Sequence, residues 1–364
     1  MRGEIGTRRL IREAVTRLDI CPPPSLERQA AAVGLPAERL LKLDQNENPY
    51  GCSLRVQEAL AAYDRFHLYP DPEQRVARER LAAYTELPSA RILLGAGAGE
   101  LIDLLCRLTL DPGDEVVVAP PTYGGYRARA ALCGARVVEA PRRPDFGLDM
   151  DALERAVTTR TKLITLVSPN NPTGNVASPE QLVRLLRLGP LVVLDESYVE
   201  FAQRAALPLA REFDNLVVLR SFSAWAGLAG LRVGYGVFPA DLMPDLWKIA
   251  PPHGVSAAAL VAVEATLDDL AHVRSTVMRV KVERGRLFRQ LRKLNLLQPL
   301  PSQGNFLLCR VLRGGARALR DRLADLGILV HWDGALADYL RISVGRPEDT
   351  DLLLKALVTI AERL

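Results

Sequence analysis

The chain has 364 residues, of which 48% are hydrophobic and 25% are charged, and its formal net charge is +4 with acidic and basic residues interspersed. This charge distribution argues against a nucleic-acid partner. The sequence has no apolar run of about 20 residues, which argues against a membrane span. The five cysteines are scattered and show no C-x-x-C spacing, which argues against a disulfide framework or a metal site. The first residues are unlike a secretory signal, so we expect a cytoplasmic protein without a metal, nucleic-acid or membrane partner.

Residues 1–42 are predicted to form an irregular, partly helical N-terminal arm. Consecutive prolines at positions 22–24 interrupt any helix before Ser25. The arm is therefore expected to precede the packed domains rather than to belong to either.

Residues 43–250 are predicted to form a large α/β domain. Short apolar runs there alternate with amphipathic helical patterns, and turn residues bound each run. Runs that are apolar on both faces indicate strands covered on both sides, as in a mostly parallel sheet flanked by helices. The expected strands are residues 91–94, 115–118, 163–167, 191–194 and 216–219.

Residues 251–364 are predicted to form a smaller α+β C-terminal domain. A chain of this length exceeds the size at which one core usually splits into two. The expected elements are a long charged helix over 273–294, strands over 306–309 and 340–344, and an amphipathic helix over 347–364.

Polar residues follow several of the expected strands at the point where each strand ends. Ligands of doubly wound sheets bind outside the carboxyl ends of the strands, so these residues are candidates for a site. Ala98 and Gly99 lie in a glycine-rich turn that opens a helix, where backbone amides can hold a phosphate. The others are Tyr123, which offers a face for a flat heterocycle, Asn171 in an irregular polar loop, and Asp195 at a buried strand end.

Each of these features has a simpler explanation when it is taken alone. The glycine-rich turn can be a tight connection, Tyr123 can pack with Tyr126 at an edge of the core, and Asp195 can form a structural salt bridge. Their joint occurrence in one order along the chain is far more specific than any single feature.

The most informative segment is Ser221-Phe222-Ser223-Ala224, with Arg232 eight residues after Ala224. With the motifs above, and with the stretches 43–51 and 339–342, it resembles the histidinol-phosphate aminotransferase group of fold-type I pyridoxal-phosphate enzymes over nearly the whole chain. That group carries at position 224 the lysine that forms a Schiff base with pyridoxal phosphate. The resemblance implies this cofactor, amino acid and 2-oxo acid substrates, and a homodimer with shared active sites.

The resemblance also implies roles for the residues that match. Asp195 would keep the pyridinium nitrogen protonated, and Tyr198 and Asn171 would hydrogen-bond the ring oxygen. Arg341 would bind the substrate α-carboxylate through its planar fork, although it can also be a surface arginine on a strand. Further implied site residues are Tyr123 on the ring face, Asn305 lining the site, Ala98, Gly99, Ser221, Ser223 and Arg232 at the cofactor phosphate, and Tyr69 from a second subunit.

Two departures from the group concern the substrate. Where the group has an arginine for the substrate phosphate, this chain has His331 followed by Trp332, and a histidine cannot make the bidentate contact of a guanidinium. The arm also has Cys21 and three prolines in place of a segment that contributes another phosphate contact. His331 and Trp332 can line a pocket for an unphosphorylated side chain, or both can simply pack.

The third departure is Ala224 itself. The six lysines, Lys42 among them, do not follow a Ser-x-Ser element, so the pattern offers no substitute. Either Ala224 is an engineered replacement that makes the chain inactive, or the chain is a natural homologue that abandoned transamination; the intact remainder of the site favours the first.

Three functions are therefore compared. The leading one is an aminotransferase whose active form carries lysine at position 224. The alternatives are a decarboxylase of the threonine-phosphate type and a non-catalytic binding protein of the same fold.

Overall fold

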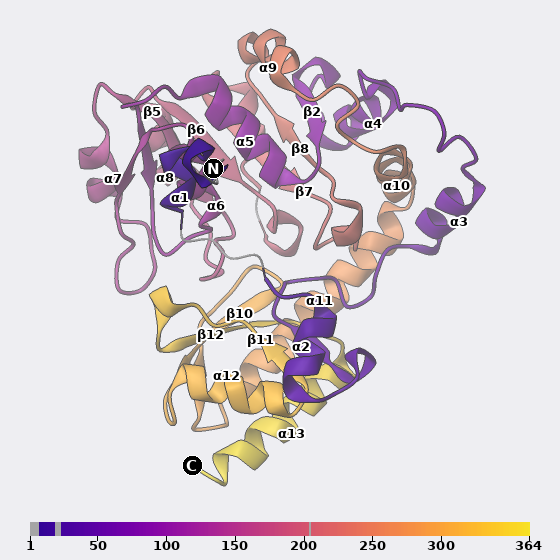
Figure 1. Ribbon diagram of the computed structural model, residues 1–364, viewed down its shortest axis with the longest axis vertical. Helices are drawn as coiled ribbons and strands as arrows, with labels where there is room; N and C mark the ends of the chain where they lie inside the picture. Colours follow the sequence, from indigo (N-terminus) through magenta and orange to yellow (C-terminus); the bar gives the residue numbers. More distant parts are fainter. Residues whose placement is uncertain (1–6, 19–22, 204) are drawn as a thin grey trace, which may run out of the picture.

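A computed structural model describes residues 7–18, 23–203 and 205–364, which fold into an upper and a lower part (Figure 1). The helix α11, Leu270–Leu291, runs from one part to the other, because Val273 and Val277 belong to an upper core and Leu287 to the lower one. A cavity lined by residues of both parts lies between them.

The upper part is built on a seven-stranded sheet in the order β2-β8-β7-β6-β5-β3-β4. β8 is antiparallel to both of its neighbours, and every other pair is parallel, which confirms the predicted mostly parallel sheet. The strands are β2 (Ile92–Gly95), β3 (Glu115–Val118), β4 (Arg136–Glu139), β5 (Thr161–Val167), β6 (Leu191–Asp195), β7 (Leu216–Ser221) and β8 (Gly234–Val237).

The five predicted runs all form strands, whereas β4 and β8 were not predicted. β4 has charged, exposed ends and lies at an edge of the sheet, so it lacks the apolar pattern of a buried strand. β8 carries glycine at 234 and 236, which depresses strand propensity. Gly236 is required because a Cβ there would lie 2.5 Å from the ring of Phe238.

Helices cover both faces of this sheet. Within β2, Ile92 and Leu94 belong to one core and Leu93 to the other, so successive side chains point to opposite faces. Residues of α3 (Leu54–Ala62), α4 (Arg75–Thr85), α7 (Met150–Ala156), α8 (Pro179–Leu186) and α10 (Ala257–Asp268) join the first core, and residues of α5 (Ala98–Thr109), α6 (Gly125–Leu132) and α9 (Met243–Ile249) join the second.

The lower part holds the C-terminal elements and a separate core. A three-stranded antiparallel sheet in the order β12-β10-β9 packs with α12 and α13, and the predicted strands and final helix are present. The elements are β9 (Leu297–Pro299), β10 (Phe306–Val311), α12 (Ala316–Asp325), β11 (Ile328–Val330), β12 (Tyr339–Ser343) and α13 (Pro347–Ala361).

The N-terminal residues contact both parts. α1, Glu13–Thr16, lies against α6, and Arg12 donates to the carbonyl of Leu132 at 2.6 Å. The strand β1, Leu41–Leu43, pairs in parallel with β11 of the lower part and follows α2, Leu26–Val33. The predicted domain boundaries at residues 42 and 250 stay predictions. In the structure, β1 pairs with a strand of the lower part, and α10 packs on α3 and α4 of the upper part.

Two sequence expectations bear on the chain as a whole. No helix among the described residues is long and apolar enough to span a membrane. Cys21 lies outside the described residues, and the other four cysteines are free thiols.

Candidate active site

A cavity of about 870 Å3 opens at the carboxyl ends of the parallel strands and is lined by residues of both the upper and the lower part. Its walls come from the strand ends, from the segment after β1 and from β12, which are far apart in sequence. Twelve of the predicted site residues line it: Ala98, Gly99, Tyr123, Asn171, Asp195, Tyr198, Ser221, Ser223, Ala224, Arg232, His331 and Arg341.

Asp195 supplies a buried carboxylate to this cavity. It ends β6 and is 5% exposed, and burial raises the pKa of its carboxyl group above the ordinary range. Its Oδ1 accepts from the backbone nitrogen of Ser197 at 2.9 Å and from its hydroxyl at 2.5 Å, while Tyr126 donates to Oδ2 at 3.5 Å. These bonds orient the carboxylate, and its partners among the described residues carry no positive charge. A cationic group of a ligand can therefore pair with Asp195.

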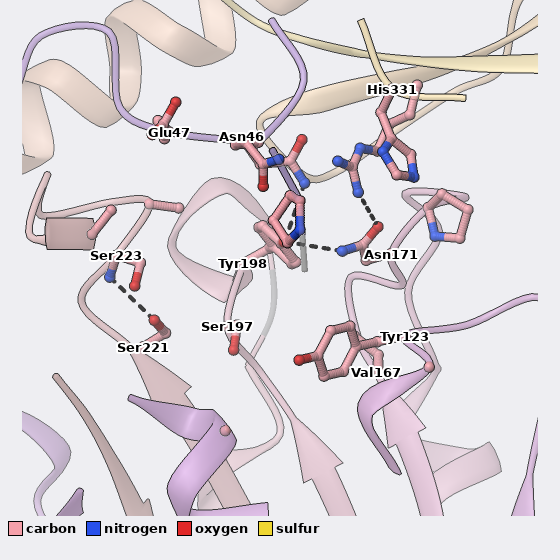
Figure 2. A pocket seen from close by; sticks show the side chains of 18 of the residues that line it. Asn46, Glu47, Tyr123, Val167, Asn171, Ser197, Tyr198, Ser221, Ser223 and His331 are labelled. Carbon is pink, nitrogen blue, oxygen red and sulfur yellow. Dashed lines mark hydrogen bonds between the residues drawn. The ribbon is translucent and has the colours of Figure 1, made fainter. Parts of the chain in front are cut away.

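A polar network crosses the cavity from Tyr198 to Arg341 (Figure 2). The Tyr198 hydroxyl accepts from Nδ2 of Asn171 at 3.2 Å and from Nδ2 of Asn46 at 3.1 Å. The Oδ1 atom of Asn171 accepts from a terminal nitrogen of Arg341 at 2.7 Å, and the other terminal nitrogen donates to the carbonyl of Asp44. Asn171 is therefore fixed in orientation by the two side chains that it joins.

The guanidinium of Arg341 is buried without a carboxylate partner. Arg341 is 8% exposed, and burial lowers the pKa of its guanidinium. Its Nε atom is buried and has no hydrogen-bond partner. A buried cation with an open donor is suited to bind an anion that enters the cavity.

An anion cradle lies at the beginning of α5. Gly97 precedes the helix with a φ of 82°, and a Cβ there would lie 2.8 Å from Nη2 of Arg232. Gly234 brings β8 close to the same turn, since its Cβ would lie 2.8 Å from the amide nitrogen of Ala98. Backbone amides at a helix N-terminus, beside a guanidinium and the hydroxyls of Ser221 and Ser223, form an anion site.

The loop 222–233 connects β7 to β8 and carries Ala224. Its ends are held together where Ser221 pairs with Gly234. Trp225 is buried and donates from its indole nitrogen to the carbonyl of Ser221 at 2.6 Å. Ala224 is 5% exposed and its side chain lines the cavity, so the position of the missing amine faces the ligand space.

His331 lies at the far wall of the cavity. Its backbone pairs with Arg341 through two hydrogen bonds, of 3.0 and 2.9 Å. Burial and the neighbouring Arg341 charge lower the pKa of its imidazole to about 4, so the ring is neutral at neutral pH. The same cavity is lined by Asp333 and, from the arm, by Pro23 and Pro24.

Two predicted residues are not in the cavity wall. Asn305 was predicted to line the site, but it is 1% exposed and donates to the carbonyl of Asn46 at 2.8 Å, so it supports the wall from behind. Tyr69 is 84% exposed and stacks on His253, outside the cavity of its own chain. Its proposed contact requires a second subunit and stays a prediction.

The sequence pattern missed a lysine in the cavity wall. Lys42 lines the cavity, and its ammonium donates to the two carboxylate oxygens of Glu47 at 2.9 and 2.8 Å. Its signal was its place directly before the matching stretch 43–51, but it was set aside with the other lysines because it does not follow a Ser-x-Ser element. Asn46 and Ser197 were also missed, although each lies beside a residue already singled out.

Comparisons with known proteins agree with this geometry. The family model described as "Aminotransferase class I and II" matches residues 38–357. The chain is 46% identical to a histidinol-phosphate aminotransferase of Roseiflexus castenholzii, over 97% of this chain and 98% of that one. It is 45% identical to the chloroplastic histidinol-phosphate aminotransferase of Nicotiana plumbaginifolia, over 89% of this chain and 80% of that one.

Solved structures show the same fold. The histidinol-phosphate aminotransferase of Sinorhizobium meliloti, solved in complex with pyridoxal-5'-phosphate, is 28% identical with a TM-score of 0.88, covering 97% of this chain and 98% of that one. An L-threonine-O-3-phosphate decarboxylase of Porphyromonas gingivalis, 24% identical with a TM-score of 0.78 over 89% of this chain and all of that one, shares the fold alone. With the family model matched over most of its length, this chain belongs to the aminotransferase class I and II family.

Proposed function

We propose that this chain is a pyridoxal-phosphate-dependent aminotransferase that moves the amino group of an L-amino acid or related amine to a 2-oxo acid, and whose Ala224 form is impaired in that reaction. The observation that carries the proposal is the meeting of Asp195, Arg232 and Arg341 in one cavity of a chain from this family.

The residues of the cavity fit pyridoxal phosphate. Asp195 is a buried carboxylate without a cation, suited to hold a protonated ring nitrogen, and the cradle of Gly97 and Arg232 suits the phosphate. Tyr198 and Asn171 lie where they can hydrogen-bond a ring oxygen between these two ends. When bound, the cofactor supplies an electron sink for bonds broken at the substrate α-carbon.

Arg341 is proposed to orient the substrate. Its terminal nitrogens are held by Asn171 and by the Asp44 carbonyl, which fix the guanidinium at the cavity wall, where it is suited to bind a carboxylate. Asn171 links this clamp to Tyr198 and thereby couples the position of substrate to that of the ring.

The substrate is proposed to lack a phosphate group. The cations of this chain in the cavity wall are Lys42, which is paired with Glu47, Arg232 at the cofactor cradle, and Arg341. His331 is neutral, and Asp333 on the same wall would repel a phosphate. The relatives are named for a phosphorylated substrate, so this is a proposed departure from them.

Ala224 determines what this form of the chain can do. In the proposed reaction a lysine at 224 holds the cofactor covalently and moves a proton at the α-carbon, and alanine does neither. Proton transfer by a placed group contributes about 10²–10⁴-fold to rate. We therefore propose that the Ala224 form binds cofactor and amino acid but turns over slowly.

The testing experiment compares the Ala224 form with Ala224→Lys. We expect both to retain pyridoxal phosphate on a desalting column, and only Ala224→Lys to transaminate free amino acids rapidly. Failure of both forms to retain the cofactor would refute the proposal. Equal turnover of the two forms would refute the role assigned to position 224.

Ala224 also favours a second candidate, a protein of this fold that binds pyridoxal phosphate without catalysis. It predicts that Ala224→Lys captures the cofactor but still fails to transaminate any amino acid. Carbon dioxide release without an acceptor oxo acid would instead identify the decarboxylase.

The homodimer and the cytoplasmic location also belong to this proposal. Three exposed apolar side chains, Leu54, Phe66 and Leu68, support the dimer. Sedimentation of the purified chain would show its oligomeric state.

A further inference from the structure

We propose that Lys42 is the amine that this cavity retains in the absence of a lysine at 224, and that it forms a reversible carbon–nitrogen double bond with the aldehyde of pyridoxal phosphate. The inference rests on the proposed function, because it requires that the cofactor binds here. It assigns a chemical role to a lysine of β1 that lines the cavity and lies outside the loop 222–233.

Lys42 is the only residue with a primary amine among the described residues that line the cavity. Lys162 lines a separate cavity near Thr109, and Lys248 lies on α9 with its side chain 72% exposed. The Lys42 backbone is fixed, because β1 pairs with β11 and places Lys42 opposite Leu329. The amine is thus held at the site and is not a mobile surface group.

Lys42 and Ala224 line the same cavity. A second cavity of about 490 Å3 adjoins the first, and both are lined by Lys42, Glu47, Ser223 and Ala229. These four residues are common to the two cavities, and Ser223 directly precedes Ala224. Figure 2 shows Glu47 on the segment above Ser223.

The partner of Lys42 can accept its proton. The Lys42 and Glu47 side chains are 29% and 42% exposed, and a partly solvated ion pair is weak enough to separate. Both carboxylate oxygens of Glu47 lie within 2.9 Å of Nζ. Glu47 is therefore placed to take the proton that the ammonium must lose before its nitrogen can attack.

The proposed step balances without another reagent. The ammonium gives one proton to Glu47, the amine adds to the aldehyde carbon, and the carbonyl oxygen leaves as water after two protonations, one from the nitrogen and one returned by Glu47. A substrate amine reverses the bond by displacing Lys42. No oxidation or reduction takes place.

The experiment traps this bond in the full-length chain. The protein is incubated with pyridoxal phosphate, freed of excess cofactor and treated with borohydride, which reduces the double bond to a stable secondary amine, and peptide mass spectrometry then locates the label. Retention of the cofactor before reduction is measured separately by absorbance. We expect the label on Lys42 at least tenfold above the label on Lys248.

Two variants make the result specific. Lys42→Arg keeps a cation beside Glu47 but cannot form the bond, so it should retain the cofactor and lose the label. Lys248→Arg changes an exposed lysine outside the cavity and should keep the label on Lys42. Ala224→Lys should move the label to position 224.

The outcomes separate the two proposals. Retained cofactor without enriched label on Lys42 would overturn the role of Lys42 and leave the proposed function standing. A chain that does not retain the cofactor would overturn both. Label on Lys42 that survives in Ala224→Lys at the same level would also contradict the inference, because the lysine at 224 should then compete for the aldehyde.

Discussion

The guanidinium of Arg341 donates to the side-chain oxygen of Asn171 over 2.7 Å, and this one bond joins the middle of β12 to the loop that follows β5. Because Asn171 also donates to the Tyr198 hydroxyl at 3.2 Å, the proposed clamp for the substrate and the proposed contacts to the ring form one network. Substitutions at either end should therefore affect binding of substrate and of cofactor differently, which allows the roles to be separated.

Arg341→Lys, introduced together with Ala224→Lys, should raise the KM for amino acids by about 10–100-fold, because one ammonium replaces a planar fork. Binding of pyridoxal phosphate should change little. Steady-state kinetics with a free amino acid measure the first quantity, and absorbance titration with the cofactor measures the second. An unchanged KM would show that the substrate carboxylate binds elsewhere.

Asp195→Asn should weaken binding of pyridoxal phosphate by about tenfold or more, because the neutral amide cannot pair with a protonated ring nitrogen. The matched control is Ser197→Ala, which removes one donor to the carboxylate but leaves its charge. Equilibrium dialysis of each variant gives the affinity. Equal affinity in Asp195→Asn and in the unaltered chain would place the ring nitrogen away from Asp195.

His331→Arg should improve use of a phosphorylated amine, because it adds a charge-assisted fork on the wall that now carries a neutral ring. In the Ala224→Lys background, kcat/KM for histidinol phosphate should rise relative to a free amino acid by about tenfold or more. His331→Gln serves as the control for the loss of the imidazole. Strong activity toward histidinol phosphate without the arginine would contradict the proposed substrate class.

The lowered pKa of His331 predicts a pH dependence of stability. The imidazole takes up a proton near pH 6.5 in the unfolded chain but only near pH 4 in the folded one, so the unfolded state binds more protons between these values. Titration of the His331 imidazole therefore leaves the free energy of unfolding unchanged above pH 6.5 and lowers it as the pH falls from 6.5 toward 4. With allowance for partial solvent exposure, this contribution amounts to about 1 kcal/mol between pH 7 and pH 5.

Urea unfolding of the unaltered chain and of His331→Gln at pH 7 and pH 5 measures this contribution. The loss of stability on acidification should be smaller in His331→Gln by about that amount. An equal loss in both chains would mean that the imidazole titrates normally in the folded state.

The large sheet could be predicted because its buried strands carry local signals. Residues 163–167 and 216–219 are apolar on both faces, which is the pattern of a strand covered by helices on both sides. The strand β8 was not predicted because it carries glycines at 234 and 236, which have low strand propensity. Glycine is present there because Arg220 and Phe238 approach the backbone closely.

The candidate site was predictable where it follows strand ends. Asp195 and Ser221 end β6 and β7, so the rule for open sheets places them together. Lys42 could not be placed in this way, because it reaches the cavity through pairing of β1 with β11, nearly the whole chain away. Asn305 was predicted to line the cavity, but it lies behind the cavity wall. No local sequence pattern distinguishes a side chain in the wall from one that supports the wall from behind.

The pairing of Ser221 with Gly234 closes the loop 222–233 at its base, and the Trp225 indole donates to the Ser221 carbonyl; neither contact uses the side chain at position 224. A change of the residue at position 224 can therefore remove or restore an amine while the contacts available to the anion remain. One residue exchange at this position can thus add or withdraw the chemistry of an amine without first rebuilding the contacts that would hold the ligand.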